Sequence, residues 1–335
     1  MERREYKQLL EKKQLPPVLL FEGEEEYLKQ DALRALRAAF LPEGLEELNE
    51  AILDAPETDA LIAAAETLPL MADRRLVIVR DHPALTGRAE ADDRLIEYLP
   101  SVPSSCILLF YCTRKPDGRK KLYSAVRKLG GVVTFAPMKD LELTTFVTNA
   151  FRDQGRECDQ RTADFLIFTV GTDTSRLLAE ISKIASYHPE EPSVSPEDVR
   201  LLATPSTECT VFDMVDAVVS GQDARAFQLL RKVLLSGEDR VFVLAMLLRQ
   251  FRLLQHIKIM QYEKLSPAAI RGALGIPPFA ADRCIRQAAL FTGGQAKRAV
   301  KLCFDTEYAI KSGRLNQEGA VEAVMLRLLC LRKKI

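Results

Sequence analysis

Residues 18–28 read VLLFEGEEEYL, a β-rich run that passes through a single glycine into a segment of helical character. A spacing near four among apolar residues predicts a helix over residues 24–41. These residues are Leu28, Ala32, Leu36 and Phe40. The same alternation recurs through the first third of the chain, which predicts a mostly parallel sheet with helices on its faces. The predicted strands are residues 18–22, 48–53, 75–80, 106–111 and 132–135, and the other predicted helices are residues 57–67 and 118–129.

The alternation of strands and helices stops after Pro137. From residue 140 onward each long segment has the helical period, and residues 203–207 (ATPST) form a break within the helical part. We therefore expect an α/β domain over residues 1–139, a small helical lid domain over 140–206 and an all-α domain over 207–335. An α/β sheet followed by a helical lid is the layout of AAA+ modules, an analogy that indicates no activity by itself.

The formal charge is unevenly distributed along the chain. The three expected domains contain 21 basic and 23 acidic, 6 and 12, and 20 and 12 residues, so their net charges are −2, −6 and +8. The basic C-terminal part suits an acidic partner, nucleic acid included. Solvated helix faces account for a surplus of this size equally well.

The residues that an ATPase of this layout needs are missing from the sequence. A phosphate-binding loop, GxxxxGK[ST], offers backbone N–H groups and a lysine to the phosphates. Residues 21–28 have one glycine, no lysine and three consecutive glutamates that would repel a triphosphate, and no Gly-Lys-Ser/Thr occurs in the chain. Tyr111 and Cys112 follow the 106–111 strand where two acids would hold magnesium. We expect no cofactor, no catalytic residues and no intrinsic ATPase activity.

Cysteine and histidine spacing gives no sign of a metal site. Seven cysteines form no CxxC pair and three histidines are isolated in sequence, which argues against disulfides and zinc. The longest charge-free apolar runs, residues 106–112 and 241–248, are far below the roughly 20 residues of a membrane helix. The charged N-terminus is unlike a secretory signal. We expect reduced, mostly buried thiols, a cytoplasmic protein and no membrane partner.

Six blocks of sequence match one known family in order and spacing. Residues 22–28 (EGEEEYL) fit a G-x-[DE]-x-[YF]-L pattern, and residues 67–77 (TLPLMADRRLV) fit LPLFG-x-RRLV. The other four blocks are residues 171–184, 211–217, 234–252 and 305–313. Together they resemble the DNA polymerase III delta subunit, the clamp-opening subunit of bacterial clamp loaders, over nearly the whole chain. Met71 replaces the family's usual phenylalanine, and Ser182 breaks its acidic EIEKL pattern.

The resemblance implies that two adjacent apolar side chains, here Leu70 and Met71, insert into a pocket of the sliding clamp. The residues support this independently, because LPLM (68–71) places apolar side chains in a helix-to-strand connection. The alternative is that they plug the sheet edge. Within this candidate clamp-binding segment we expect Leu68 to pack in the core. Arg74, like the neighbouring Arg75, either supports the contact or flanks the strand.

Two basic clusters are candidate contacts with DNA or partner subunits. The first is the run RKPDGRKK over residues 114–121, with Arg119, Lys120 and Lys121, and the second holds Lys311 and Arg314. Such residues can neutralise DNA phosphates. A solvated loop and helix start explain the first cluster without DNA, and only Tyr123 is near it for base stacking. We expect the long helix around residues 247–254, and residues Phe212, Phe242 and Phe279, to belong to cores.

The resemblance implies a non-catalytic subunit of the polymerase holoenzyme, with an AAA+-like domain, a lid and a helical collar. Its implied partners are the sliding clamp (beta), the loader's ATPase subunits (tau/gamma), delta prime and primer–template DNA. The chain would bind the clamp, bias one interface open and release it when the ATPase subunits act.

Two other functions stay open. An AAA+ ATPase or doubly wound nucleotide-dependent enzyme would bind ATP tightly, although residues 21–28 contradict it. A free-standing nucleic-acid-binding protein would bind DNA in a salt-sensitive way without a clamp.

Overall fold

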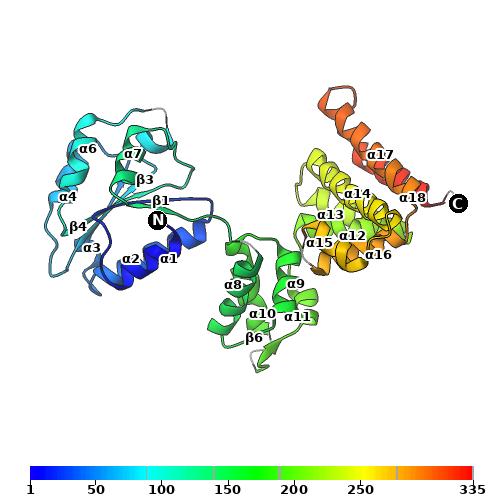
Figure 1. Ribbon diagram of the computed structural model, residues 1–335, viewed down its shortest axis with the longest axis horizontal. Helices are drawn as coiled ribbons and strands as arrows, with labels where there is room; N and C mark the ends of the chain where they lie inside the picture. The colour runs from blue at the N-terminus through cyan, green and yellow to red at the C-terminus, as the bar shows by residue number, and fades with distance from the viewer. Residues whose placement is uncertain (88, 139, 188–189, 277, 334–335) are drawn as a thin grey trace. The chain divides into compact units, whose positions relative to one another are not determined.

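The computed structural model describes residues 1–87, 89–138, 140–187, 190–276 and 278–333. The chain divides into two compact units, Met1–Met138 and Lys139–Ile335. The first unit alternates strands and helices, and the second is mainly helical (Figure 1). The predicted boundary between a lid and an all-α domain, at residues 206/207, lies inside the second unit, so the three-domain division stays a prediction.

A parallel sheet forms the centre of the first unit. Among the described residues it has five strands in the order β2-β3-β4-β1-β5. The strands are β1 (Val18–Glu22), β2 (Glu50–Asp54), β3 (Arg75–Arg80), β4 (Cys106–Tyr111) and β5 (Val132–Thr134). Every pairing in this sheet is parallel, and Leu20 of β1 lies opposite Phe110 of β4 and Val132 of β5. The predicted α/β class is confirmed.

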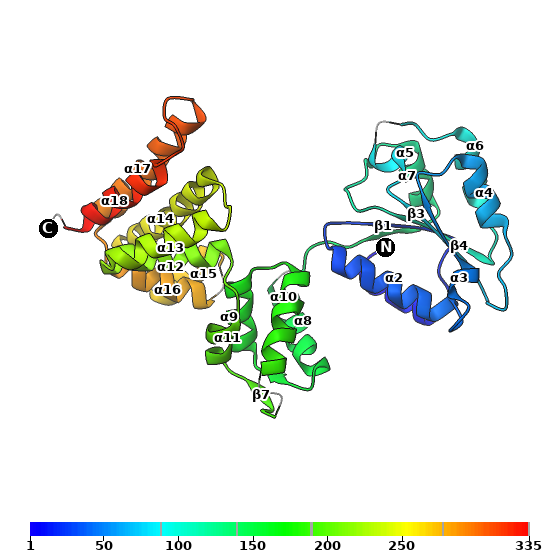
Figure 2. The ribbon, with the colours of Figure 1, turned by 180° about the vertical axis from the view of Figure 1, so that it is seen from behind.

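Helices cover both faces of the sheet (Figures 1 and 2). On one face, Leu20, Val77 and Leu108 pack with the helices that precede and follow β3 and β4. These helices are α4 (Thr58–Glu66), α5 (Pro83–Thr86), α6 (Asp93–Tyr98), which the short 3-10 turn η1 (Leu99–Ser101) extends, and α7 (Lys121–Lys128). The other face carries α1 (Arg3–Glu11) and α2 (Glu26–Phe40), where Tyr6 stacks edge-to-face on Phe21 with the ring centroids 5.3 Å apart. Because both of their faces are buried, β1, β3 and β4 are apolar runs without alternation, whereas β2 at the edge of the sheet is only partly buried.

One predicted strand begins later than expected. Residues 48 and 49 belong to the short helix α3 (Glu46–Asn49), and β2 starts at Glu50, where pairing with Leu76 of β3 begins. The prediction of a strand over 48–53 was therefore wrong at its first two residues. The side-chain amide of Asn49 donates to the carbonyl oxygen of Leu45 at 3.0 Å, a local bond that competes with extended backbone.

The second unit begins with four helices and a short strand pair. The helices are α8 (Asp140–Asp153), α9 (Gln160–Val170), α10 (Thr174–Tyr187) and α11 (Pro196–Leu202). Ser195 caps α11 in a capping box with Asp198. The sequence Ser-Pro-Glu-Asp predicts this helix start by itself, because it places a cap serine, a first-turn proline and acids in order. The parallel pair β6 (Glu157–Cys158) and β7 (Ser193–Val194) was missed, because two residues are too few for a strand pattern.

The remaining helices pack around one long central helix, α14. They are α12 (Thr207–Ser220), α13 (Asp223–Leu235), α14 (Arg240–Tyr262), α15 (Pro267–Leu274), α16 (Pro278–Ala289), α17 (Gly293–Lys311) and α18 (Ala320–Lys333). Leu247 and Phe251 are fully buried, so residues 247–254 supply core as predicted, whereas Phe242 in the first turn of α14 is exposed and that prediction was wrong. None of the helices in the described ranges combines the length and apolar composition needed to span a bilayer.

Candidate functional site

The connection between α4 and β3 exposes three large apolar side chains. Leu68 is 77% exposed, Leu70 51% and Met71 83%. We call residues 68–71 the apolar tip. The prediction that Leu68 packs in the core was wrong: α4 ends at Glu66 and the backbone turns extended at Thr67, which carries Leu68 away from the buried face of the helix.

A buried side chain holds the backbone of the apolar tip in place. The carboxamide of Asn49 accepts a hydrogen bond from the backbone N–H of Leu70 at 2.7 Å and donates one to its carbonyl oxygen at 2.9 Å. Asn49 itself is fully buried beneath the tip. A single amide thus satisfies both backbone groups of Leu70 and leaves its side chain directed to solvent. Nothing in the sequence identified Asn49, because its partner lies 21 residues away.

Met71 has an unusual backbone conformation. Its φ is +53°, in the left-handed region that side chains other than glycine rarely occupy. This conformation costs about 1–2 kcal/mol. The hydrogen bonds from Asn49 to the backbone of the neighbouring Leu70 offset that cost. The backbone of the apolar tip therefore has one defined conformation.

The charged residues after the apolar tip point back to the domain. Arg74 is half-buried, donates to the carbonyl oxygen of Leu15 at 3.0 Å and lies 5.3 Å from the ring centroid of Phe40. Asp73 pairs with Lys13 at 2.9 Å, and this hydrogen bond holds the pKa of Asp73 below its usual value. These contacts place Arg74 at the base of the apolar tip, and the choice between support of the clamp contact and a residue that only flanks the strand stays a prediction.

Arg75 fastens the opposite side of the apolar tip. Its guanidinium donates to the carbonyl oxygen of Leu48 at 2.8 Å, and its backbone N–H donates to that of Ser105 at 2.7 Å. It therefore ties α3 to the start of β3. Like Arg74, it contacts the residues that surround the base of the apolar tip.

The loop from β1 to α2, where a phosphate loop would lie, packs against the chain itself. Gly23 has a φ of +117°, and a Cβ there would lie 2.1 Å from the carbonyl oxygen of Phe135. The backbone N–H of Phe135 donates to the carbonyl oxygen of Glu22 at 2.8 Å, and the backbone N–H of Glu25 donates to the carbonyl oxygen of Phe135 at 3.3 Å. Glycine is therefore required here by close approach of two backbones.

A buried lysine joins the carboxyl ends of β1 and β4, the switch point of the sheet where α/β proteins usually bind ligands. Lys29 on α2 is fully buried, and its ammonium donates to the carbonyl oxygen of Cys112 at 2.7 Å and pairs with Glu26 at 2.9 Å. The hydroxyl of Tyr111 donates to Glu26 at 2.6 Å. Burial raises the pKa of Glu26, but the bonds from Tyr111 and Lys29 outweigh it, so the pKa lies below its usual value. Helical spacing alone gave no hint that Lys29 is buried.

The basic residues predicted in the first unit are each paired within the chain. The pairs are Arg119–Asp117 at 2.9 Å, Lys120–Glu90 at 2.9 Å and Lys121–Asp93 at 3.1 Å. Exposed pairs such as those of Arg119 and Lys121 contribute little to stability, whereas the side chain of Lys120 is only 15% exposed. The pairing favours the plainer interpretation of a solvated surface, and a DNA contact there stays a prediction.

Of the two basic residues of the second cluster, Lys311 is the last residue of α17 and Arg314 follows the end of that helix. Lys311 pairs with Glu307 at 2.5 Å, and the guanidinium of Arg314 lies 5.7 Å from the ring centroid of Tyr308. Both cations are thus engaged by neighbours in sequence. A contact of either with DNA or another subunit stays a prediction.

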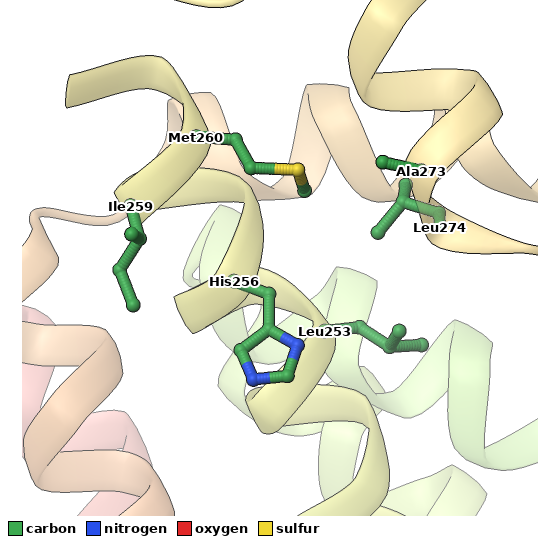
Figure 3. Close-up of a pocket in the computed structure, with 6 residues that line it drawn as sticks. All are labelled: Leu253, His256, Ile259, Met260, Ala273 and Leu274. Carbon is green, nitrogen blue, oxygen red and sulfur yellow. The ribbon is translucent and has the colours of Figure 1, made fainter. Parts of the chain in front are cut away.

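The described histidines lie in unlike surroundings. His256 borders a hollow between α14 and α15 whose other lining residues are apolar (Figure 3). His82 accepts from the backbone N–H of Ala84 at 3.2 Å, and burial lowers its pKa. Across the described ranges, no group of three or more histidine, cysteine or acidic side chains is placed to hold a metal ion. His188 lies outside the described residues.

Comparisons with known proteins agree with one another. The family model described as DNA polymerase III, delta subunit, matches residues 19–136, and that of the DNA polymerase III delta subunit, C-terminal domain, matches residues 208–328. The DNA polymerase III subunit delta of Bacillus subtilis is 26% identical over 334 residues, which cover 97% of this chain and 96% of that protein. Its namesake in Escherichia coli is 23% identical over 246 residues, 72% of this chain and 68% of that protein.

A solved structure supports the same fold. The Bacillus subtilis DNA clamp loader delta protein superposes on this chain with a TM-score of 0.54 at 24% identity. The superposition covers 98% of this chain and 99% of that one. The two family models together span well over half of the residues, on both sides of the boundary between the units.

Proposed function

Because the chain belongs to the DNA polymerase III delta subunit family, we propose that its apolar tip binds the sliding clamp and opens the ring. Leu70 and Met71 would insert into an apolar pocket of the clamp, so that a clamp loader can place the ring on primed DNA. The single observation that carries the proposal is an exposed apolar pair on a backbone fixed by Asn49.

The size of the tip fits an anchor of moderate strength. Full burial of a leucine or methionine side chain contributes roughly 1.5–3 kcal/mol, so the pair offers roughly 3–6 kcal/mol before the costs of association. Leu70 is half-exposed and has less left to bury than Met71. The flexible thioether of Met71 can fill a pocket shaped for an aromatic ring.

Opening a ring requires more than attachment. A ligand shifts an equilibrium between closed and open forms only by its difference in affinity for the two. A fixed tip contributes such a difference, because it fits a clamp surface distorted toward the open form and cannot relax to suit the closed one. The hydrogen bonds of Asn49 and the base formed by Arg74 supply this stiffness.

We assign the energy input to partner ATPase subunits and not to this chain. The packing of Gly23 against Phe135 and the burial of Lys29 support a module without intrinsic ATPase activity. The proposed partners are the clamp, the ATPase subunits, delta prime and primer–template DNA, in the cytoplasm. Arg119, Lys311 and their neighbours are the proposed contacts with DNA or subunits.

Calorimetry of the full chain with a bacterial sliding clamp, without nucleotide, tests the proposal. We expect saturable binding, and loss of most of the affinity in Leu70→Ala/Met71→Ala. The matched control is Leu201→Ala/Leu235→Ala, which removes two equally exposed leucines from the second unit and should bind like the parent. Circular dichroism checks the fold. Undiminished binding by the tip variant would exclude the tip as the anchor, and no binding by the parent chain would exclude the function.

A further inference from the structure

Four arginine side chains from three helices line one hollow in the second unit. They are Arg200 on α11, Arg225 on α13, and Arg283 and Arg286 on α16. The hollow has a volume of about 400 Å³, within the range of small-molecule sites. Asp213 is the carboxylate that the described lining residues contribute. The packing of the helices does not by itself require four arginines around one hollow.

Two of the four guanidinium groups are already neutralised. Arg283 contacts Asp213 and donates from Nε to Asp216 at 2.6 Å. Gln287 holds Asp216 from the other side at 2.6 Å. Arg200 pairs with Glu197 at 2.9 Å on the rim. Arg225 and Arg286 are left without a carboxylate partner among these contacts, and the four arginines with Asp213, Asp216 and Glu197 have a net charge of +1.

Arg225 and Arg286 supply the positive charge that exceeds the charge of the three carboxylates. Both are exposed, and Arg225 donates to the neutral amide oxygen of Gln222 at 3.2 Å. Arg286 has no hydrogen bond or ion pair with any residue in the described ranges. Two guanidinium groups that face one hollow without carboxylate partners form a site for an anion with several oxygens, because the planar fork matches phosphate geometry.

An aromatic wall lies beside these charges. Phe165, Phe168 and Phe279 line the same hollow in edge-to-face contact, with centroids 5.1 Å and 5.3 Å from the ring of Phe279. The guanidinium of Arg200 lies 5.3 Å from the ring centroid of Phe165. Arginines next to aromatic rings are the combination that binds a phosphate joined to a base.

We propose that this hollow binds a phosphate-bearing ligand of nucleotide chemistry. Arg225 and Arg286 would contact the phosphate, and the phenylalanines would contact the base of the ligand. The site lies outside the apolar tip and does not depend on the proposed clamp function. The phosphate belongs either to a free nucleotide or to the phosphodiester backbone of a single DNA strand, and both sources present negatively charged phosphate oxygens on a molecule that carries a base.

Calorimetric titration of the full chain with ADP and, separately, with the oligonucleotide (dT)12 at constant ionic strength tests the proposal. We expect saturable binding of at least one probe and at least a tenfold weaker dissociation constant in Arg225→Ala/Arg286→Ala. Binding of ADP identifies a free nucleotide as the ligand, and binding of (dT)12 alone identifies a DNA strand.

The matched control is Arg231→Ala, an exposed arginine on α13 that does not line the hollow. It should bind like the parent chain. Arg286→Gln alone serves if the double variant is misfolded by circular dichroism, and it should weaken binding several-fold. The proposal is overturned if neither probe binds at concentrations up to about 5 mM, or if the variants that remove Arg286 bind as tightly as the control.

Discussion

Removal of the Asn49 carboxamide should loosen the apolar tip without removing its apolar atoms. In Asn49→Ala, Leu70 loses both backbone hydrogen bonds and Leu45 loses one, and each bond contributes about 0.5–1.5 kcal/mol net. Water can replace part of this at an exposed loop, so we expect a loss of about 1–3 kcal/mol in unfolding free energy, measured by urea titration.

The effect on the clamp has a separate origin. If Leu70 and Met71 become mobile, binding must order two residues at about 1–2 kcal/mol each. Arg74 and Arg75 still restrain the base of the tip in the variant, so a penalty of about 1–3 kcal/mol is expected, a roughly 5- to 150-fold weaker dissociation constant by calorimetry. Asn149→Ala, an exposed asparagine on α8, is the control. Clamp affinity within twofold of the parent, together with reduced stability, would refute the view that Asn49 positions the tip.

Three further predictions concern the frame around the sites. Gly23→Ala should lower stability by about 2–4 kcal/mol in urea titrations, because its Cβ would meet backbone at 2.1 Å, whereas Gly44→Ala, which meets open space at a φ of +80°, should cost about 1 kcal/mol. The folded pKa of Glu26 lies below its unfolded value, so the stabilisation by Glu26 is present above about pH 4.5 and is lost as the pH falls through the folded pKa. The variant Glu26→Gln should therefore lose less unfolding free energy than the parent on acidification. An equal loss in the two proteins would contradict this. Arg283→Ala should lower the thermal midpoint, with a loss of about 2–4 kcal/mol, because two aspartates of α12 lose their partner; an unchanged midpoint would show that solvent already neutralises them.

The sequence predicted the features that local patterns determine. Continuous apolar runs such as residues 106–111 mark strands buried on both faces, and Ser195 followed by proline and acids marks a helix start. The apolar tip was also predictable, because apolar residues in a connection are conspicuous. Leu68 was misplaced because no local pattern indicated that the backbone turns extended at Thr67, directly after the end of α4.

Residues that act through distant contacts were not predictable. Asn49 meets Leu70 only after β2 and β3 pair, and Lys29 meets Cys112 across 83 positions of sequence. An asparagine or a lysine in a helix is normally read as solvated. The hollow around Arg286 was missed for the same reason, because its arginines come from helices that are far apart in the sequence.

The buried ammonium of Lys29 has a thermodynamic consequence for the whole first unit. It fills the switch point of the sheet in the way a bound cation would, with a carbonyl and a carboxylate as its ligands. Because this occupant is covalently part of the chain, its effective concentration is constant and cannot be diluted or competed away. Because this occupant already takes the place of a ligand, we expect the conformation of the first unit not to change with the concentration of ATP. We therefore predict that the affinity of this chain for the proposed clamp partner is the same with and without ATP, which would leave any ATP-dependent step to the proposed ATPase subunits.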